Sequence, residues 1–334
     1  MRLPFDQFMR RALYDPQHGY YTRHIAGVGS RGDFTTAPML GEHLGQAISR
    51  WAALALKETK CHHLIEIGPG TGELARQVWS RLPLALRWST TLHLVETSPR
   101  LTQLQQQNLG RRVRWHASPT EALAACQGRA VIYSNELVDA FPVRRFRKTT
   151  DGWREIGVEI SPSSPLPSSL QSSTFDLGPS TFTECLLEAE VLPDSTIFDQ
   201  IWHSGQCVEV HESYRDWLSQ WLPLWQTGRM LTIDYGAEAK DLYHRQPEGS
   251  IRAYLLQQRL TGADIYQNIS RQDLTADVNF SDLIAWSSPH LKTLKLSRLA
   301  DFLPSTAPAP LRDADGAGRA FQVLDQERSS GGKS

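Results

Sequence analysis

Paired cysteines and long apolar segments are both missing from this 334-residue chain. Its four cysteines form no Cys-x-x-Cys pair, which argues against a disulfide scaffold and against a structural zinc site. No apolar run approaches the roughly 20 residues that span a bilayer, and residues 1–6 lack the apolar core of a secretory signal. We therefore expect no membrane insertion and a reducing cytoplasm as the location.

An excess of charge of one sign is also missing, because 35 Lys and Arg face 36 Asp and Glu. A net charge of −1 gives no global attraction to nucleic acid, so nucleic acid is not an expected partner. No Gly-x-Ser-x-Gly is present, and a hydrolase nucleophile turn has no support. The His62-His63 pair has no second pair at ligand spacing, so we predict no metal site.

What the sequence does contain is an alternation of apolar strand candidates with helical stretches, which is typical of a parallel, doubly wound α/β sheet. Before it, apolar residues recur at helical spacing in residues 5–13 and predict a packed first helix. A mitochondrial presequence is the alternative for that segment, but its acidic residues disfavour it. The predicted strands are Leu64–Gly68, Leu92–Glu96, Val113–His116, Ala130–Asn135 and Arg229–Asp234.

Composition divides the chain further. A Pro- and Ser-rich stretch over residues 161–173 predicts a loop inside an insertion, and the polar stretch over residues 237–282 predicts a second insertion near the site. The expected units are an N-terminal helical or lid segment (1–60), a cofactor-binding core (61–148, continued at 207–236 and completed at 283–327), the two insertions (149–206 and 237–282) and a tail (328–334).

The segment Glu-Ile-Gly-Pro-Gly-Thr-Gly at residues 66–72 reads as a strand entering a glycine-rich turn that opens a helix. A dinucleotide turn wants its third glycine one place later, where this chain has Glu73, and Pro69 removes an amide that a pyrophosphate would use. Both features favour S-adenosylmethionine over NAD. The predicted cofactor contacts of the turn are Glu66, Gly68, Gly70, Thr71 and Gly72.

Glu96 ends the next strand candidate and precedes Thr97-Ser98-Pro99, a helix-start signal. A carboxylate in that place can accept hydrogen bonds from two ribose hydroxyls. The alternative is that Glu96 only caps the following helix. Its position beside the glycine turn favours the cofactor contact.

Polar residues also follow two later strands, as Asn135–Pro142 and as Asp234-Tyr235-Gly236. In an open α/β sheet, ligands bind beyond the carboxyl ends of the strands. Carboxylates beside a methyl donor suit a cationic acceptor, above all an arginine guanidinium. The alternative for Asn135, Glu136 and Asp139 is an ordinary helix-capping cluster.

Seven segments carry a resemblance to a known family. In chain order they are Pro4–Tyr21, Gly32–Pro38, Glu66–Gly72, Asn135–Pro142, Asp234–Gly236, Gly249–Tyr254 and Asp273–Ala276. They resemble the MidA-like methyltransferases, a family that includes a mitochondrial complex I assembly factor. The resemblance implies a Rossmann-like class I fold with a mainly parallel seven-stranded sheet, an N-terminal helical segment and inserted segments. From the mitochondrial member it implies symmetric dimethylation of an arginine in a complex I subunit.

The predicted chemistry is in-line methyl transfer to an arginine nitrogen, in which proximity supplies much of the acceleration. Glu136 would hold the guanidinium with Asp139 in support, and Asn135 would orient the methyl donor or the acceptor. A small-molecule methyltransferase and a non-catalytic assembly chaperone that binds the cofactor remain alternatives, and an oligomer is possible. Further expected site residues are Asp33, Thr35 and Thr36 in a lid or, equally, a capped turn, with Asp234, Tyr235 and Arg252 on the acceptor side.

The chain departs from the family at two positions. Gln257 and Asp277 stand where the family commonly has histidines. These changes leave cofactor binding as expected and bear on catalysis and on the choice of acceptor.

Overall fold

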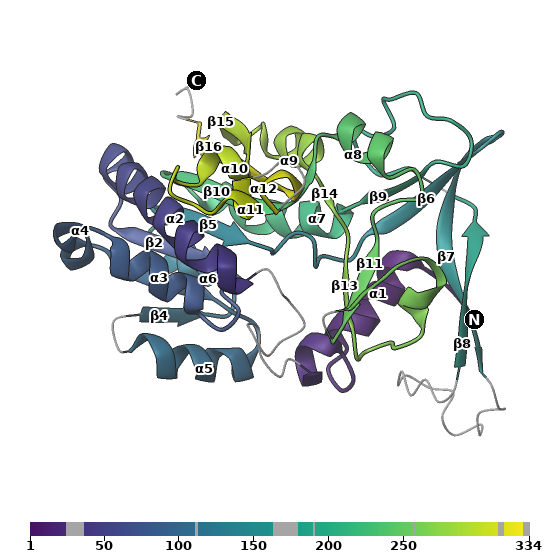
Figure 1. The fold of residues 1–334 in the computed structure, drawn as a ribbon, viewed down its shortest axis with the longest axis horizontal. Coiled ribbons are helices and arrows are strands. Elements are labelled where there is room, and N and C mark those ends of the chain that lie inside the picture. The colour runs from purple at the N-terminus through teal and green to yellow at the C-terminus, as the bar shows by residue number, and fades with distance from the viewer. Residues whose placement is uncertain are drawn as a thin grey trace.

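The computed structural model describes residues 1–24, 37–110, 113–162, 180–189, 191–256, 258–312 and 317–329 (Figure 1). The predicted Pro- and Ser-rich loop lies almost entirely outside these residues, as do Gln257 and residues 330–334 of the tail. No helix within the described ranges is long and apolar enough to cross a membrane.

The central sheet confirms the predicted mainly parallel α/β fold. Strands β10, β5, β2, β3 and β4 run parallel to one another, and β16 lies between β10 and β15, antiparallel to both. The short strand β14 (Val278–Asn279) adds a parallel partner to β10. In spatial order the seven principal strands are β15 (Leu291–Arg298), β16 (Phe321–Arg328), β10 (Arg229–Ala237), β5 (Val131–Asn135), β2 (His63–Ile67), β3 (Thr91–Val95) and β4 (Val113–His116).

Helices cover both faces of this sheet, because its strands are apolar on both sides. On one face, Leu64 and Leu92 pack with α2 (Ala37–Thr59) and α3 (Glu73–Arg81). On the other, Ile65 packs with α6 (Pro119–Ala125), α7 (Glu212–Trp221) and α9 (Phe280–Ser287). The remaining helices are α4 (Leu84–Ser89), α5 (Pro99–Leu109), α8 (Ala239–Arg245), α10 (Leu299–Phe302), α11 (Ala309–Arg312) and α12 (Ala317–Ala320), with short turns at Tyr20–His24, Leu222–Leu224 and Gly262–Tyr266.

A second sheet joins the N-terminus to the first predicted insertion. Its strands pair in the order β1-β7-β6-β9, and β8 also pairs with β7. The range 149–206 contributes β7 and β8, while β6 and β9 come from the residues that flank it. The five strands are β1 (Arg2–Pro4), β6 (Arg144–Thr149), β7 (Gly152–Pro162), β8 (Ser180–Leu187) and β9 (Cys207–Val210).

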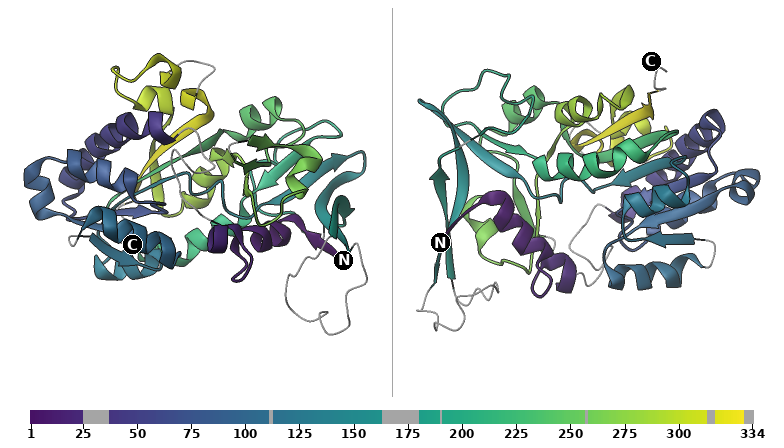
Figure 2. Two further views of the ribbon diagram at one scale, coloured as in Figure 1. Left: turned by 60° about the horizontal axis from the view of Figure 1, so that its bottom comes forward. Right: turned by 180° about the vertical axis from the view of Figure 1, so that it is seen from behind.

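The range 237–282 forms α8 and a third sheet, in which β11 (Arg252–Leu255) lies between β12 (Gln258–Leu260) and β13 (Asp273–Thr275). Helix α1 (Phe5–Tyr14) packs on this region, and its five predicted apolar residues are all buried. In Figures 1 and 2, α1 lies beside β11 and β13 and near the N-terminal edge of the second sheet. The first residues of the chain are therefore built into the part of the molecule that faces the carboxyl ends of the central strands.

Candidate functional site

The glycine-rich turn joins the end of β2 to the start of α3. Gly68, Gly70 and Gly72 have φ values of 69°, 54° and 80°, a left-handed region that favours glycine. A Cβ on Gly68 would also lie 2.8 Å from Leu137 Cδ1. Glycine at 68 is therefore required by backbone conformation and by the close approach of the segment after β5.

Gln105 on α5 connects this turn to Glu96. Its Nε2 donates to Gly70 O at 2.7 Å and to Glu96 Oε2 at 3.3 Å. Its Oε1 accepts from Trp115 Nε1 at 3.0 Å, and the side chain is fully buried. Sequence reasoning missed Gln105, because a glutamine in a polar helical run looks like a solvent-exposed position. The turn and Glu96 are thus held together by one side chain.

Glu96 directly follows the last residue of β3 and is half-buried. Its Oε1 accepts from Ser98 N at 2.8 Å. Ser98 is the residue that caps α5, since Ser98 Oγ accepts from Leu101 N at 3.4 Å. Ser98, and not Glu96, therefore caps α5, and Glu96 makes only one hydrogen bond to the turn before the helix. A contact between Glu96 and the ribose stays a prediction.

Glu66 lies deeper than the rest of the turn. Its side chain accepts a hydrogen bond from Tyr133 OH at 2.7 Å across to β5. Burial raises the pKa of Glu66 to about 8. Glu66 is therefore buried in β2 before the turn begins. Thr71 is half-buried and lies in the turn itself. Direct contact of either residue with the cofactor stays a prediction.

The segment after β5 carries the predicted catalytic residues and is held by Asp234 of β10. Asp234 is fully buried, and its Oδ2 accepts from Leu137 N at 3.1 Å and Val138 N at 2.8 Å. Glu136 has a φ of 50°, a left-handed conformation that is costly for a residue with a Cβ. Asn135 Nδ2 donates to Glu136 Oε1 at 3.1 Å. Asp234 therefore positions this segment through hydrogen bonds to its backbone.

Several carboxyl groups gather around the same segment. Burial raises the pKa of Asp139 well above its usual range, and the nearby carboxyls of Asp234, Glu136 and Asp273 raise it further. Burial also raises the pKa of Glu136, and that of Asp234 to about 7. Arg252 acts in the opposite direction on Asp139 and Glu136. A bound cation would favour the ionised forms of these groups.

Arg252 itself is already engaged. Its Nη1 forms an ion pair with Asp277 and donates to Ser250 O at 3.3 Å. Its guanidinium carbon lies 5.1 Å from the centre of the Tyr235 ring, within cation–π range. Asp277 thus neutralises Arg252 locally and leaves the carboxyl cluster less compensated.

Two tyrosines from the N-terminal segment reach the same region. Tyr21 OH donates to Asp273 Oδ1 at 2.8 Å, and Tyr14 OH donates to Ala140 O at 2.9 Å. Their rings lie 5.3 Å apart. Sequence reasoning did not name Tyr14, Tyr21 or Asp273 as site residues, although all three lie in segments that carry the family resemblance.

A family model described as "Putative S-adenosyl-L-methionine-dependent methyltransferase" matches residues 45–296. The matched range includes the glycine turn, Glu96 and the segment after β5. The chain belongs to this family. The cofactor in the family's description is the one that the turn and Glu96 predict.

Relatives of known name are similar over most of the chain. The mitochondrial protein arginine methyltransferase NDUFAF7 of Xenopus tropicalis is 27% identical over 307 residues, 82% of this chain and 65% of the relative. The NDUFAF7 homolog of Caenorhabditis elegans is 26% identical over 327 residues, 90% of this chain and 70% of the relative. The aligned part thus spans less than two thirds of the Xenopus relative.

A solved structure shares the fold. A "likely methyl transferase" from Burkholderia thailandensis, bound to S-adenosyl-homocysteine, superposes with a TM-score of 0.79 at 24% identity. The superposition covers 98% of this chain and 88% of that one. The shared fold therefore extends beyond the central sheet to nearly the whole chain.

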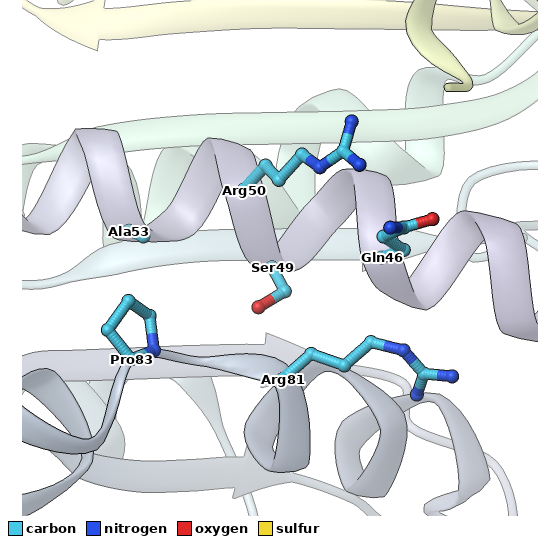
Figure 3. A pocket seen from close by; sticks show the side chains of 6 residues that line it. All are labelled: Gln46, Ser49, Arg50, Ala53, Arg81 and Pro83. Carbon is cyan, nitrogen blue, oxygen red and sulfur yellow. The ribbon is translucent and has the colours of Figure 1, made fainter. Parts of the chain in front are cut away.

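The predicted lid residues Asp33, Thr35 and Thr36 lie outside the described residues. A surface cavity of about 330 Å³ lies between α2 and the end of α3 (Figure 3). Arg81 in its lining is the last residue of α3, whereas the glycine turn precedes the first, so about 12 Å of helix separates the two. This cavity is not the predicted cofactor site. Its lining residues are Gln46, Ser49, Arg50, Ala53, Arg81 and Pro83.

Proposed function

We propose that this family member transfers a methyl group from S-adenosyl-L-methionine to an arginine nitrogen of a protein. The observation that carries the proposal is the carboxyl cluster of Glu136, Asp139 and Asp273, whose nearby cation, Arg252, is already paired with Asp277. A guanidinium entering beside this cluster would supply the missing positive charge. Its planar donors suit carboxylate acceptors.

The donor side follows from the turn. Gly68 and Gly72 leave backbone free of side chains at the carboxyl end of β2, and Glu96 would accept from the ribose hydroxyls. Gln105 holds the turn and Glu96 in place by hydrogen bonds to both. The cofactor supplies a methyl group on a sulfonium, which is a good leaving group.

The protein's own contribution is alignment and charge. Glu136 holds the positive charge on one side of the guanidinium, so that the opposite nitrogen is richer in electrons and attacks the methyl carbon in line. The new N–C bond forms as the C–S bond breaks, the sulfur keeps the electron pair, and the methylated guanidinium nitrogen releases one proton to solvent. Asp234 keeps Glu136 and Asp139 in position through the backbone of their segment.

The names of the relatives support a protein acceptor, and the family resemblance points to an arginine in a subunit of a respiratory complex. Such an acceptor would put the protein in the mitochondrial matrix of a eukaryote or the cytoplasm of a bacterium. Tyr14 and Tyr21, which reach the carboxyl cluster from the N-terminal segment, would line the path of an arginine side chain.

The test has two stages. Calorimetric titration with S-adenosylhomocysteine, alongside NAD, measures cofactor binding, and labelled methyl transfer to candidate subunits and their arginine-to-lysine variants measures the reaction. Glu136→Gln should leave binding of S-adenosylhomocysteine intact and lower the transfer rate by about 100-fold, as expected when one electrostatic contact is removed. The exposed Glu248→Gln serves as the matched control.

Binding without transfer to any protein or small molecule would overturn the methyltransferase proposal in favour of an assembly chaperone that binds the cofactor. Transfer to a small molecule alone would assign a different acceptor. Equal losses of binding and transfer in Glu136→Gln would contradict the role given to that carboxylate.

A further inference from the structure

Three histidines and a cysteine meet on the face of the central sheet that α6 covers. His63 begins β2, His93 lies within β3, His116 ends β4, and Cys126 follows the last residue of α6. Side chains alternate between the two faces of a strand, and these strands direct the histidines away from α2 and α3. His93 and Cys126 are almost completely buried.

Two side chains converge on one nitrogen of His93. His63 Nδ1 lies 3.0 Å from His93 Nε2, and Cys126 Sγ lies 3.5 Å from that same atom. Ligand atoms of all three residues lie within 4.8 Å of one another. Among the described residues this is the one group of three His, Cys, Asp or Glu side chains that converges in this way.

These separations match a metal centre. Zinc bound tetrahedrally at about 2.0–2.1 Å from nitrogen and about 2.3 Å from sulfur holds two nitrogens about 3.3 Å apart and a nitrogen and a sulfur about 3.6 Å apart. The observed 3.0 and 3.5 Å need small adjustments. Imidazole and thiolate together suit a borderline cation such as zinc.

His116 completes the arrangement from the far side. Its Nε2 lies 2.9 Å from His93 Nδ1, the ring nitrogen that does not contact His63. Cys126 Sγ lies 4.0 Å from that nitrogen and is closer to Nε2. A metal-binding histidine usually donates its second N–H to an acceptor, which fixes the ring and its tautomer.

We propose that His63, His93 and Cys126 bind one zinc ion or a cation of similar chemistry, with His116 positioning His93. The site neighbours the predicted cofactor contacts without including them. His63 opens β2, whereas the glycine turn follows its last residue, roughly 16 Å further along the strand. His93 lies three residues before Glu96, roughly 10 Å along β3, and His116 O accepts from Glu96 N at 3.0 Å. The ion would join β2, β3 and the end of α6, so its role is to stabilise the cofactor-binding domain.

Linear spacing alone predicts no metal site in this chain. His63 and His93 are 30 residues apart, and His93 and Cys126 are 33 apart. Neither separation belongs to a familiar ligand motif. The adjacent His62 turns elsewhere, with its Nδ1 3.1 Å from Ser89 O.

The experiment titrates the metal-stripped full chain with Zn²⁺ and, separately, with Co²⁺. We expect one equivalent of zinc by equilibrium dialysis, and a thiolate-to-cobalt charge-transfer band in the near ultraviolet. Zinc at a hundredfold excess over its dissociation constant should raise the melting temperature by about 4 °C for a chain of this length.

The variants assign the ligands. His63→Gln and Cys126→Ser should weaken zinc binding at least 100-fold, and Cys126→Ser should also abolish the charge-transfer band. His116→Gln should weaken zinc about tenfold and keep the band, because it acts through His93. His62→Gln and the buried but distant Cys207→Ser are matched controls that should bind zinc like the unmodified chain.

Titration with S-adenosylhomocysteine checks that each variant folds. His63 is only half-buried, so His63→Gln should fold. It therefore still tests the site if Cys126→Ser does not fold. The proposal is overturned if the folded chain binds no zinc at micromolar concentrations. It is equally overturned if His63→Gln binds zinc as tightly as His62→Gln.

Discussion

Adding one methyl group at Gly68 tests whether the glycine turn and the catalytic segment depend on each other. Gly68 has a φ of 69°, and a Cβ there would meet Leu137 Cδ1 at 2.8 Å. Gly262 has a φ of 60° and nothing within 4 Å of a Cβ. Gly68→Ala and Gly262→Ala therefore share the backbone cost and differ in the crowding of Leu137.

The size of each effect follows from these contacts. A left-handed conformation costs an alanine about 1–2 kcal/mol, and this term appears in both variants. Leu137 Cδ1 is the end of a flexible side chain, so it can turn away at about 0.5–1.5 kcal/mol if it leaves its preferred rotamer. Gly68→Ala should thus lower the free energy of unfolding by about 0.5–1.5 kcal/mol more than Gly262→Ala. The gain from a stiffer unfolded chain is common to both and cancels.

Urea unfolding gives this difference, and calorimetric titration with S-adenosylhomocysteine gives its effect on binding. If binding restores the strained turn, the affinity of Gly68→Ala should fall by the same free energy, which is roughly two- to twelvefold. Gly262→Ala should bind like the unmodified chain. Identical stability and identical affinity for the two variants would refute the coupling between the turn and Leu137.

Three further outcomes are expected. Gln105→Leu should weaken binding of S-adenosylhomocysteine up to about 30-fold by calorimetry, because it loses two hydrogen bonds of about 1 kcal/mol each, to the turn and to Glu96; unchanged affinity would contradict the bridging role. Burial raises the pKa of Asp139, so its stabilising effect is present below the unfolded pKa of about 3.9 and is lost as pH rises through the folded pKa. Asp139→Asn should therefore be more stable than the unmodified chain at pH 8, with the difference vanishing near pH 4 in urea unfolding; a difference that grows toward acid would refute this. Asp277→His should cost about 3 kcal/mol of unfolding free energy, because it leaves the buried Arg252 unpaired, and full stability would contradict the importance of that pair.

The central sheet could be predicted from the sequence because its strands are short apolar segments bounded by polar residues. Val113–His116 agrees with β4 at both ends, and the other predicted starts fall within one residue of those observed. Helix α1 could also be predicted, since its apolar spacing depends only on residues that are close in sequence. These elements are set by local patterns of period 2 and 3.6.

The second sheet could not be predicted in this way, because β1 pairs with β7 across more than 150 residues. Gln105 shows the same limit within the site, since its two partners lie on other segments. Asp234 was expected on the acceptor side from its place after a strand. Full burial and bonds to backbone N–H groups make it a support for the segment after β5. Such roles depend on partners that no local pattern reveals.

The place of β16 in the central sheet has a consequence for synthesis of the protein. β16 separates β10 from β15 and is the partner of both. Until residues 321–328 leave the ribosome, one edge of β10 lacks its antiparallel partner, and an unpaired edge invites association with other chains. At about 5–20 residues per second, the 91 residues from the end of β10 at Ala237 to the end of β16 at Arg328 take on the order of 5–18 s. The nascent chain would therefore need protection during that interval, and truncation before Phe321 should produce aggregation.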